Sequence, residues 1–325
     1  MNKIRTMAEL GGPAEALHLL VPGGIGDISW IYSKICQLGK FLKRKILISA
    51  PLEAPARAED FLTLLPEVYW AGYLEGLTSW QVLSQSLPGN WPDHLGLSPF
   101  LWHGCPVNLA PNIHLEMGRT LASWLPMLPT TYHYPLAIPP ADLWQADRLI
   151  STLPRPIFTV YVSNRDKDAI RSGGWSLWSS LQWVSFLKSV LNIPECVSGS
   201  IILLGAEYDR DKTETVANGL EGACPLRCLI AQPLGMALHC LARSNYCFSY
   251  PSGIGILANV LHTPGLMLLP WLLSGLEKAY ADPCDLASQR YRAWANPSPE
   301  QAFEWFKNVS MPQLLAENKG NWLAR

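Results

Sequence analysis

Short apolar runs alternate with amphipathic stretches along most of the chain. Runs such as 45–51 (KILISAP) and 200–206 (SIILLGA) are typical of strands buried on both faces of a sheet. After residue 27, Ile28, Ile31 and Ile35 recur at helical spacing, which predicts a helix with one buried face. Strands that alternate with helices in this way predict an α/β protein, with parallel sheets covered by helices on both faces.

The pattern divides into two similar halves. In the first, it predicts strands at 16–22, 45–51 and 68–74, helices after residue 27 and at 56–66, 79–87 and 113–125, and a Trp-, Pro- and Gly-rich loop at 88–112. In the second, it predicts strands at 155–163, 200–206, 226–231, 245–251 and 265–270 and helices at 178–191, 209–220, 233–244, 253–262 and 298–309. The alternation pauses at the proline-rich stretch 139–155. We therefore expect two doubly wound domains, 1–145 and 146–325, with the last helix a candidate to return to the first domain.

Composition and charge narrow the function classes. Of the 325 residues, 49% are hydrophobic and 16% charged, which excludes a disordered chain. The formal net charge of -1 gives no electrostatic basis for gripping nucleic acid or an anionic membrane. Pro264 and Pro270 interrupt the most apolar stretch, so no membrane span is expected, and the start of the chain lacks the apolar core of a signal peptide. The eight cysteines lack zinc-finger spacing and are read as reduced core residues of a cytoplasmic protein.

A glycine turn ends the first predicted strand, in the stretch VPGGIGD (21–27). It is not a P-loop, because no Gly-Lys-Ser/Thr follows, and Ser29 stands where a dinucleotide motif would place its third glycine. Gly24 and Gly26 permit a tight turn and the close approach of an acceptor. Asp27 either caps the following helix by accepting a backbone N–H, or takes a proton from an acceptor hydroxyl as a general base.

A second glycine turn follows the strand at 245–251, in the stretch YPSGIGILANVLH (250–262). Ser252 is a natural helix N-cap, and Gly253 and Gly255 leave the first turn uncovered. Unpaired N–H groups and the helix dipole favour an anion such as a diphosphate at such a position. Ordinary capping with close helix packing is the alternative.

The order of these segments resembles the heptosyltransferase-type glycosyltransferases, the ADP-heptose:lipopolysaccharide transferases and their relatives, which have the GT-B fold. LLVPGGIGDISWIYSKI is similar to the family's first strand, Gly-Asp turn and helix, whose aspartate is the proposed catalytic base, here Asp27. IILLGAEYDRDKTETVA is similar to the family's Gly-Ala-x-x-Glu segment near the donor nucleoside, which points to Glu207. The stretch 228–270 resembles the closing signature that forms the donor diphosphate site. In that signature Pro251, Ser252 and Gly253 replace Asp-Thr-Gly, and Ile256 replaces a histidine, so the resemblance does not imply ADP-heptose itself as donor.

The resemblance implies two Rossmann-like, parallel-sheet domains that face a central cleft. It also implies inverting transfer of a hexosyl, pentosyl or heptosyl group from a nucleotide-diphosphate sugar to an acceptor hydroxyl. No cofactor and no metal are expected, since the second half has no Asp-x-Asp pair at a strand end. VSNRDKDAIRSGGWSLWSSLQWVSFL (162–187) resembles the loop and helix that bring a basic residue to the diphosphate, here one of Arg165, Lys167 and Arg171.

Several of these residues have a plainer reading. The cations at 165–171 could form a solvated loop, and Glu207 an exposed loop charge. His114 and Arg119 are candidates for the acceptor side, although a solvated helix face explains them as well.

The acceptor stays open at this stage. A lipopolysaccharide-type glycan would place the enzyme at the inner face of the membrane. A modified nucleobase in DNA, as used by viral DNA-glycosylating enzymes, is a rival that the near-neutral charge disfavours. From another class, a non-catalytic nucleotide- or sugar-binding protein on a degenerate scaffold would explain the altered donor signature.

Overall fold

The computed structural model of the chain describes residues 5–10, 16–21, 23–29, 32, 45–52, 58–76, 78, 97–100, 113–116, 133–163, 178–271, 274 and 277–317. The chain forms two compact units, residues 1–139 and 140–325. The predicted division at 145/146 passes through helix α4 (Pro140–Ile150), which opens the second unit.

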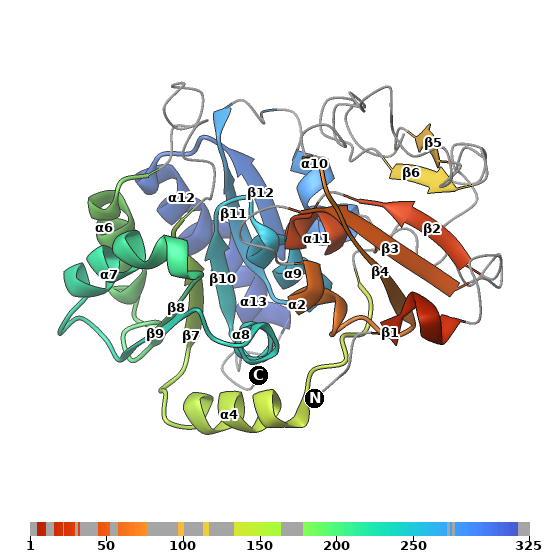
Figure 1. Cartoon of the computed structure of the whole chain (residues 1–325). Helices are drawn as coiled ribbons and strands as arrows, with labels where there is room; N and C mark the ends of the chain where they lie inside the picture. The colour runs from red at the N-terminus through yellow and green to blue at the C-terminus, as the bar shows by residue number, and fades with distance from the viewer. Residues whose placement is uncertain are drawn as a thin grey trace. The chain divides into compact units, whose positions relative to one another are not determined.

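A mixed sheet forms the framework of the first unit (Figure 1). Its strand order is β1-β4-β3-β2-β6-β5. Four neighbours run parallel: β1 (Arg5–Thr6), β4 (Val68–Leu74), β3 (Lys45–Pro51) and β2 (Ala16–Leu20). Next to β2, β6 (Ile113–Glu116) and β5 (Leu97–Phe100) continue the sheet in antiparallel fashion. Two helical segments accompany the sheet, η1 (Met7–Leu10) and α2 (Ala58–Leu62).

The strands predicted at 16–22, 45–51 and 68–74 are confirmed, whereas the helix predicted from residue 113 is wrong at its start. Residues 113–116 pair with β2 and β5, and such pairing overrides a local helical pattern. Strand β5 likewise lies within the stretch predicted as a loop. The helix predicted at 79–87 lies outside the described residues.

The second unit is built on a fully parallel sheet with the order β12-β11-β10-β7-β8-β9. Its strands are β7 (Ile157–Tyr161), β8 (Ser200–Gly205), β9 (Leu226–Ile230), β10 (Tyr246–Ser249), β11 (Gly265–Leu269) and β12 (Tyr291–Ala295). Counted along the chain from β9, the order is 3-2-1-4-5-6, that of doubly wound dinucleotide-binding folds. Five of these strands were predicted from their apolar runs. The sixth, β12, was not.

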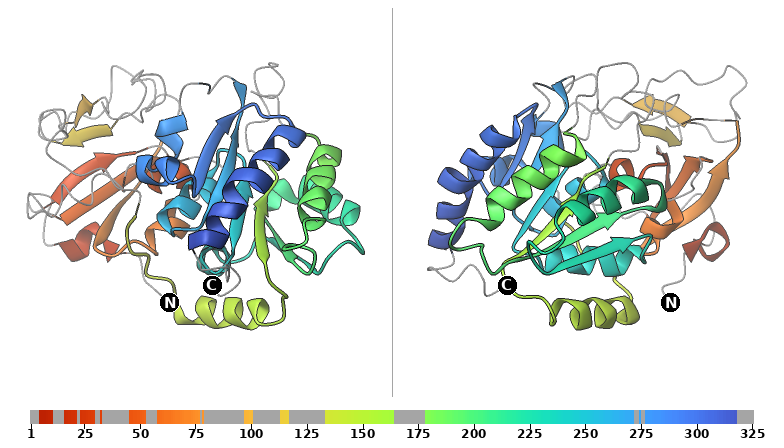
Figure 2. Two further views of the ribbon diagram at one scale, coloured as in Figure 1. Left: turned by 180° about the vertical axis from the view of Figure 1, so that it is seen from behind. Right: turned by 90° about the vertical axis from the view of Figure 1, so that its left-hand side faces the viewer.

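Helices cover both faces of this sheet (Figure 2). One face packs against α6 (Ser180–Leu191), α7 (Arg210–Gly219), α12 (Pro299–Trp305), the π-helical segment η8 (Phe306–Ser310) and α13 (Met311–Glu317). The opposite face packs against α4, α8 (Leu234–Ala242) and α9 (Gly253–Val260). The 3-10 segment η6 (Glu207–Asp209) precedes α7, and α10 (Glu277–Tyr280) and α11 (Pro283–Ala287) precede β12. The final helices pack in the second unit's own core through Ala302, Phe306 and Leu314.

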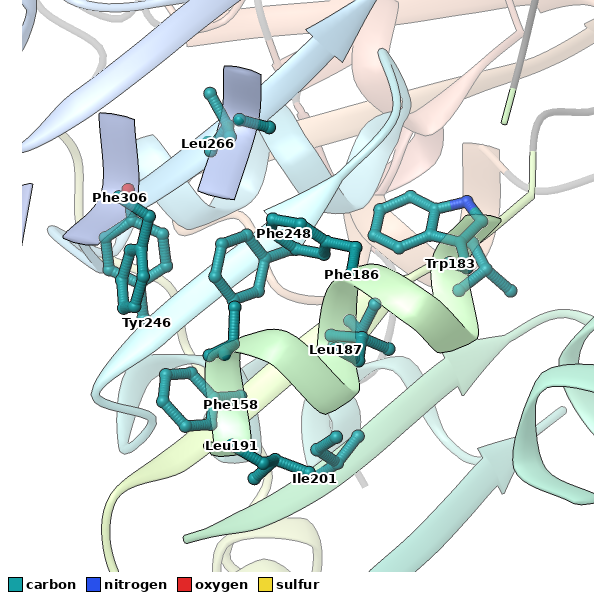
Figure 3. Packing of buried hydrophobic residues seen from close by; sticks show 14 of the residues in the cluster. Phe158, Trp183, Phe186, Leu187, Leu191, Ile201, Tyr246, Phe248, Leu266 and Phe306 are labelled. Atoms are coloured by element: carbon teal, nitrogen blue, oxygen red, sulfur yellow. The ribbon is translucent and has the colours of Figure 1, made fainter. Parts of the chain in front are cut away.

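An aromatic cluster holds the first of these faces together (Figure 3). The ring of Phe248 on β10 lies 5.0 Å from that of Phe186 on α6, 5.3 Å from Phe306 and 4.8 Å from Tyr246. Phe158 on β7 stacks on it at 6.0 Å. Because residues alternate between the two faces of a strand, every second residue of β7 and β10 enters this cluster.

We expect Phe248→Ala to destabilise the protein by about 3–5 kcal/mol, because the cavity would lie at the centre of four rings that cannot all move inward. Urea unfolding followed by circular dichroism measures the loss. Leu181→Ala is the matched control, since Leu181 lies on α6 with 81% of its surface exposed. Equal effects of the two substitutions would contradict this view of the core.

Candidate functional site

Strands β7 and β10 are neighbours in the second sheet, but the helices that follow them pack on opposite faces. After β7 the chain leads to α6 on one face, and after β10 it leads to α9 on the other. Doubly wound folds bind their ligands at such a reversal, beyond the carboxyl ends of the two strands. The described residues that follow these strand ends are 162–163 and 250–253, and residues 162–179 connect β7 to α6 along the chain. The predicted cations Arg165, Lys167 and Arg171 belong to this connection, in a part of it that lies outside the described residues.

The start of α9 supplies backbone donors at this strand reversal. Ser252 is its N-cap, and the Ser252 hydroxyl accepts the N–H of Gly255 at 3.3 Å. The Ser252 carbonyl accepts the N–H of Ile256 at 3.1 Å. The N–H groups of Gly253 and Ile254 have no acceptor within the helix, as is usual for a first turn, and both residues are partly exposed. The two donors can therefore receive an anion.

Gly255 serves packing rather than ligand access. A Cβ at this position would lie 2.6 Å from the Ser249 hydroxyl oxygen and 2.7 Å from the Met267 methyl carbon. The Tyr291 hydroxyl also donates to the Gly255 carbonyl at 2.6 Å. The absent side chain thus lets α9 press against β10 and β11. Of the two glycines predicted here, Gly253 is the one that offers a donor.

Glu207 and Asp209 follow β8 and have very different surroundings. The Glu207 side chain is 64% exposed and receives two hydrogen bonds of 2.7 Å from Arg210. This contact lowers the pKa of Glu207. Asp209 is buried, and its Oδ2 accepts the Tyr161 hydroxyl at 3.0 Å and the Ala206 N–H at 2.8 Å. Asp209 therefore ties the end of β7 to the end of β8, and counting Gly-Ala-x-x-acid along the sequence would have indicated 209 rather than 207.

Lys212, in the first turn of α7, brings a cation to the same edge of the sheet. Its Nζ donates to the Trp178 carbonyl at 3.2 Å and lies 5.1 Å from the centre of the Tyr250 ring. Burial lowers the pKa of Lys212 to about 8, although the nearby Asp209 acts in the opposite direction. Sequence reasoning missed Lys212, since the polar stretch 209–220 reads as a solvated helix face.

In the first unit, the predicted base Asp27 lies in the helical turn formed by residues 25–29 and is partly buried. Its carboxylate folds back over Gly24, so that a Cβ on Gly24 would lie 2.5 Å from Asp27 Oδ2. The Gly24 carbonyl accepts the N–H of Ile28 at 3.0 Å. Hydrogen bonds at its last residue hold the turn in place: the Tyr134 hydroxyl pairs with the Ser29 hydroxyl and is also within hydrogen-bond distance of the Ser29 carbonyl.

Two of the other predicted acceptor-side residues, Gly26 and His114, are among the described residues. Gly26 lies within the same helical turn. His114 lies on β6, in the strand that replaces the predicted helix, and Arg119 lies outside the described residues. In the described ranges, no group of three or more His, Cys, Asp or Glu residues could hold a metal ion. Over the same ranges, no helix combines the length and apolar character needed to cross a bilayer.

No family model and no curated protein sequence matches the chain. Solved structures do. The chain is similar to Escherichia coli ADP-heptose LPS heptosyltransferase II, with a TM-score of 0.57 and 15% identity over 94% of this chain and 99% of that one. It is also similar to a glycosyl transferase family 9 protein from Veillonella parvula, with a TM-score of 0.51 and 12% identity over 90% of this chain and 89% of that one.

The chain has the GT-B fold. Both units of this GT-B protein are α/β, as the alternating pattern predicts, and the α9 start and Asp27 belong to different units. At these identities the likeness is one of fold.

The lowered pKa of Lys212 predicts a pH-dependent stability. Below pH 8 the lysine is charged in both the folded and unfolded states, so the folded state bears the full cost of burying the charge. Between about pH 8 and 10.5 the folded state has released the proton and the unfolded state has not, which relieves this cost. We expect Lys212→Met to be more stable than the wild type at pH 7, by about 1–2 kcal/mol, with the difference shrinking toward pH 10.

Urea unfolding at pH 7, 8, 9 and 10 measures this difference. Lys188→Met removes the same charge from an exposed position on α6 and should show no such trend. A Lys212→Met variant that is less stable at pH 7, or a difference independent of pH, would show that the buried charge carries no cost.

Proposed function

We propose that the protein is a glycosyltransferase that moves a sugar from a nucleotide-diphosphate sugar to an acceptor hydroxyl, with inversion and without a metal ion. The observation that carries this proposal is the capped start of α9 at the strand reversal of a GT-B protein. There the N–H groups of Gly253 and Ile254 lie in a partly exposed first turn, at the strand ends where such folds bind nucleotides. A diphosphate is the part of the donor that these groups fit.

The departing diphosphate needs stabilisation, because negative charge builds on it as the bond to the sugar breaks. The two N–H donors and the dipole of α9 provide it without rearrangement. One of Arg165, Lys167 and Arg171 adds a cation from the segment after β7. With these groups in place, the leaving step does not require a divalent metal.

Asp27 is the proposed base on the acceptor side. It removes the hydroxyl proton as the acceptor oxygen attacks the anomeric carbon, and the bond from that carbon to the diphosphate oxygen breaks on the opposite side. A single displacement of this kind inverts the anomeric configuration. The absence of a side chain at Gly24 leaves room for the Asp27 carboxylate close to the turn, and the hydrogen bonds between Ser29 and Tyr134 hold the turn itself.

The donor is a hexosyl, pentosyl or heptosyl nucleotide. One similar structure is described as an ADP-heptose LPS heptosyltransferase. In this chain Asp-Thr-Gly is replaced by Pro251, Ser252 and Gly253, which removes the carboxylate from the start of α9. An anionic donor would be repelled less by this start than by one with an aspartate.

We expect Asp27→Asn to reduce turnover by about 100-fold or more while donor affinity stays unchanged, because the amide keeps the shape of the carboxylate but cannot accept the proton. A thermal-shift screen of sugar nucleotides first selects the donor. Release of nucleoside diphosphate then measures turnover, and calorimetry measures affinity. Asp60→Asn, at an exposed position on α2, is the control. Unchanged turnover in Asp27→Asn would remove Asp27 from the mechanism.

We expect Gly24→Ala to reduce turnover at least tenfold, because the new methyl group would occupy the place of Asp27 Oδ2 and turn the carboxylate away. The same assay, with Gly24→Ala made alone and combined with Asp27→Asn, tests this. If Gly24 acts through Asp27, the glycine substitution adds nothing to the double variant. A full additional loss there would refute the link.

A further inference from the structure

Lys212 is poorly explained as a structural residue. It makes no ion pair among the described residues, and its one hydrogen bond is to the neutral Trp178 carbonyl. An ammonium group has three N–H donors, so this bond leaves donor capacity over. A methionine could fill the same space without the cost of burying a charge. Charges kept at such a cost are a common sign of function.

Its position is at the strand reversal. Tyr250, whose ring the ammonium group faces, follows β10 and precedes the α9 N-cap by two residues. Trp178 stands at the end of the segment that links β7 to α6. Lys212 packs on the side of the sheet that carries α6 and α7, whereas α9 packs on the other side. The cation and the α9 N–H groups therefore belong to helices on opposite faces of the sheet, on either side of the strand reversal.

The groups around Lys212 leave its charge largely uncompensated. Asp209 stands at the N-cap position of α7, three residues before Lys212. Among the described residues it is the one carboxylate that acts electrostatically on Lys212. Asp209 already accepts the Tyr161 hydroxyl and the Ala206 N–H. Tyr250 is neutral, because burial raises its pKa, and its hydroxyl oxygen accepts the Trp183 indole N–H at 3.1 Å. The charged residues of segment 164–177 lie outside the described residues.

We propose that Lys212 is a charge-supplying residue of the donor site, which stabilises the diphosphate from the face of the sheet opposite α9. This inference rests on the proposed function. It adds a second cation to the one proposed among Arg165, Lys167 and Arg171. The ligand it recognises is the diphosphate group, not the nucleoside or the sugar. Its contribution is electrostatic, so it depends on the charge of Lys212 rather than on its shape.

The experiment compares a nucleoside with its diphosphate. Wild type, Lys212→Met, Lys212→Arg and the control Lys188→Met are titrated calorimetrically at pH 7 with ADP, UDP and GDP and with the matching nucleosides. For the diphosphate that the wild type binds, we expect Lys212→Met to weaken affinity about tenfold or more and to leave the nucleoside unchanged. Lys212→Arg should restore most of the loss, and Lys188→Met should have no effect.

A second measurement needs no variant. Because Lys212 loses its proton near pH 8 in the free protein, wild-type affinity for the diphosphate, relative to the nucleoside, should fall as the pH rises from 7 to 9.5. In Lys212→Arg it should stay constant.

Three outcomes would overturn the inference. Equal weakening of nucleoside and diphosphate in Lys212→Met would mean that Lys212 only supports the shape of the site. Unchanged diphosphate affinity would mean that its charge does not reach the ligand. If the wild type bound none of the diphosphates, the proposed function would fail together with this inference. The first two outcomes refute the role of Lys212 alone, so the two failures can be told apart.

Discussion

The strand reversal at the centre of the second sheet is the constraint on which the candidate site depends. Neighbouring strands β7 and β10 run parallel, yet their helices leave toward opposite faces. The first turn of α9 has N–H donors without an acceptor in the helix, and its residues Gly253 and Ile254 are partly exposed. The glycines near it do different work, since Gly253 offers a donor and Gly255 lets the helix approach the sheet. The anion site that we propose here would follow from the topology rather than from a charged side chain.

Three aromatic residues joined by hydrogen bonds extend the core to the strand reversal. The Trp183 indole donates to the Tyr250 hydroxyl at 3.1 Å, and that hydroxyl donates to the Trp178 carbonyl at 3.3 Å. Trp178 in turn donates to the Pro297 carbonyl at 3.0 Å, just ahead of α12. These contacts fix the end of β10 and the start of α6 relative to each other. The face of Tyr250 that meets Lys212 is thus part of a rigid wall, so a charge placed on it has a defined position.

Much of this arrangement could be predicted from the sequence, and the exceptions have physical causes. Buried parallel strands read as apolar runs, which is why five strands of the second sheet and three of the first were found. Strand β12 was missed because it is short and Arg292 interrupts it, so that it does not form a continuous apolar run; Arg292 and Trp294 are partly exposed. Strand β6 was read as a helix because β2, the partner that joins it to the rest of the sheet, is remote in sequence. The glycine turns were visible as motifs, but the burial of Asp209 and the pairing of Glu207 with Arg210 depend on how η6 folds after β8.

The close packing of α9 against β10 and β11 at Gly255 limits how the fold could adapt to a different ligand. Met267 and Ser249 leave no room for a methyl group at residue 255, so the helix cannot shift outward or rotate to suit a larger ligand without breaking its contact with two strands. If the protein uses a sugar nucleotide as proposed, a change of donor preference would have to come from the connections that follow β7 and β8. Libraries aimed at such a change should vary those connections and keep the β10–α9 corner constant.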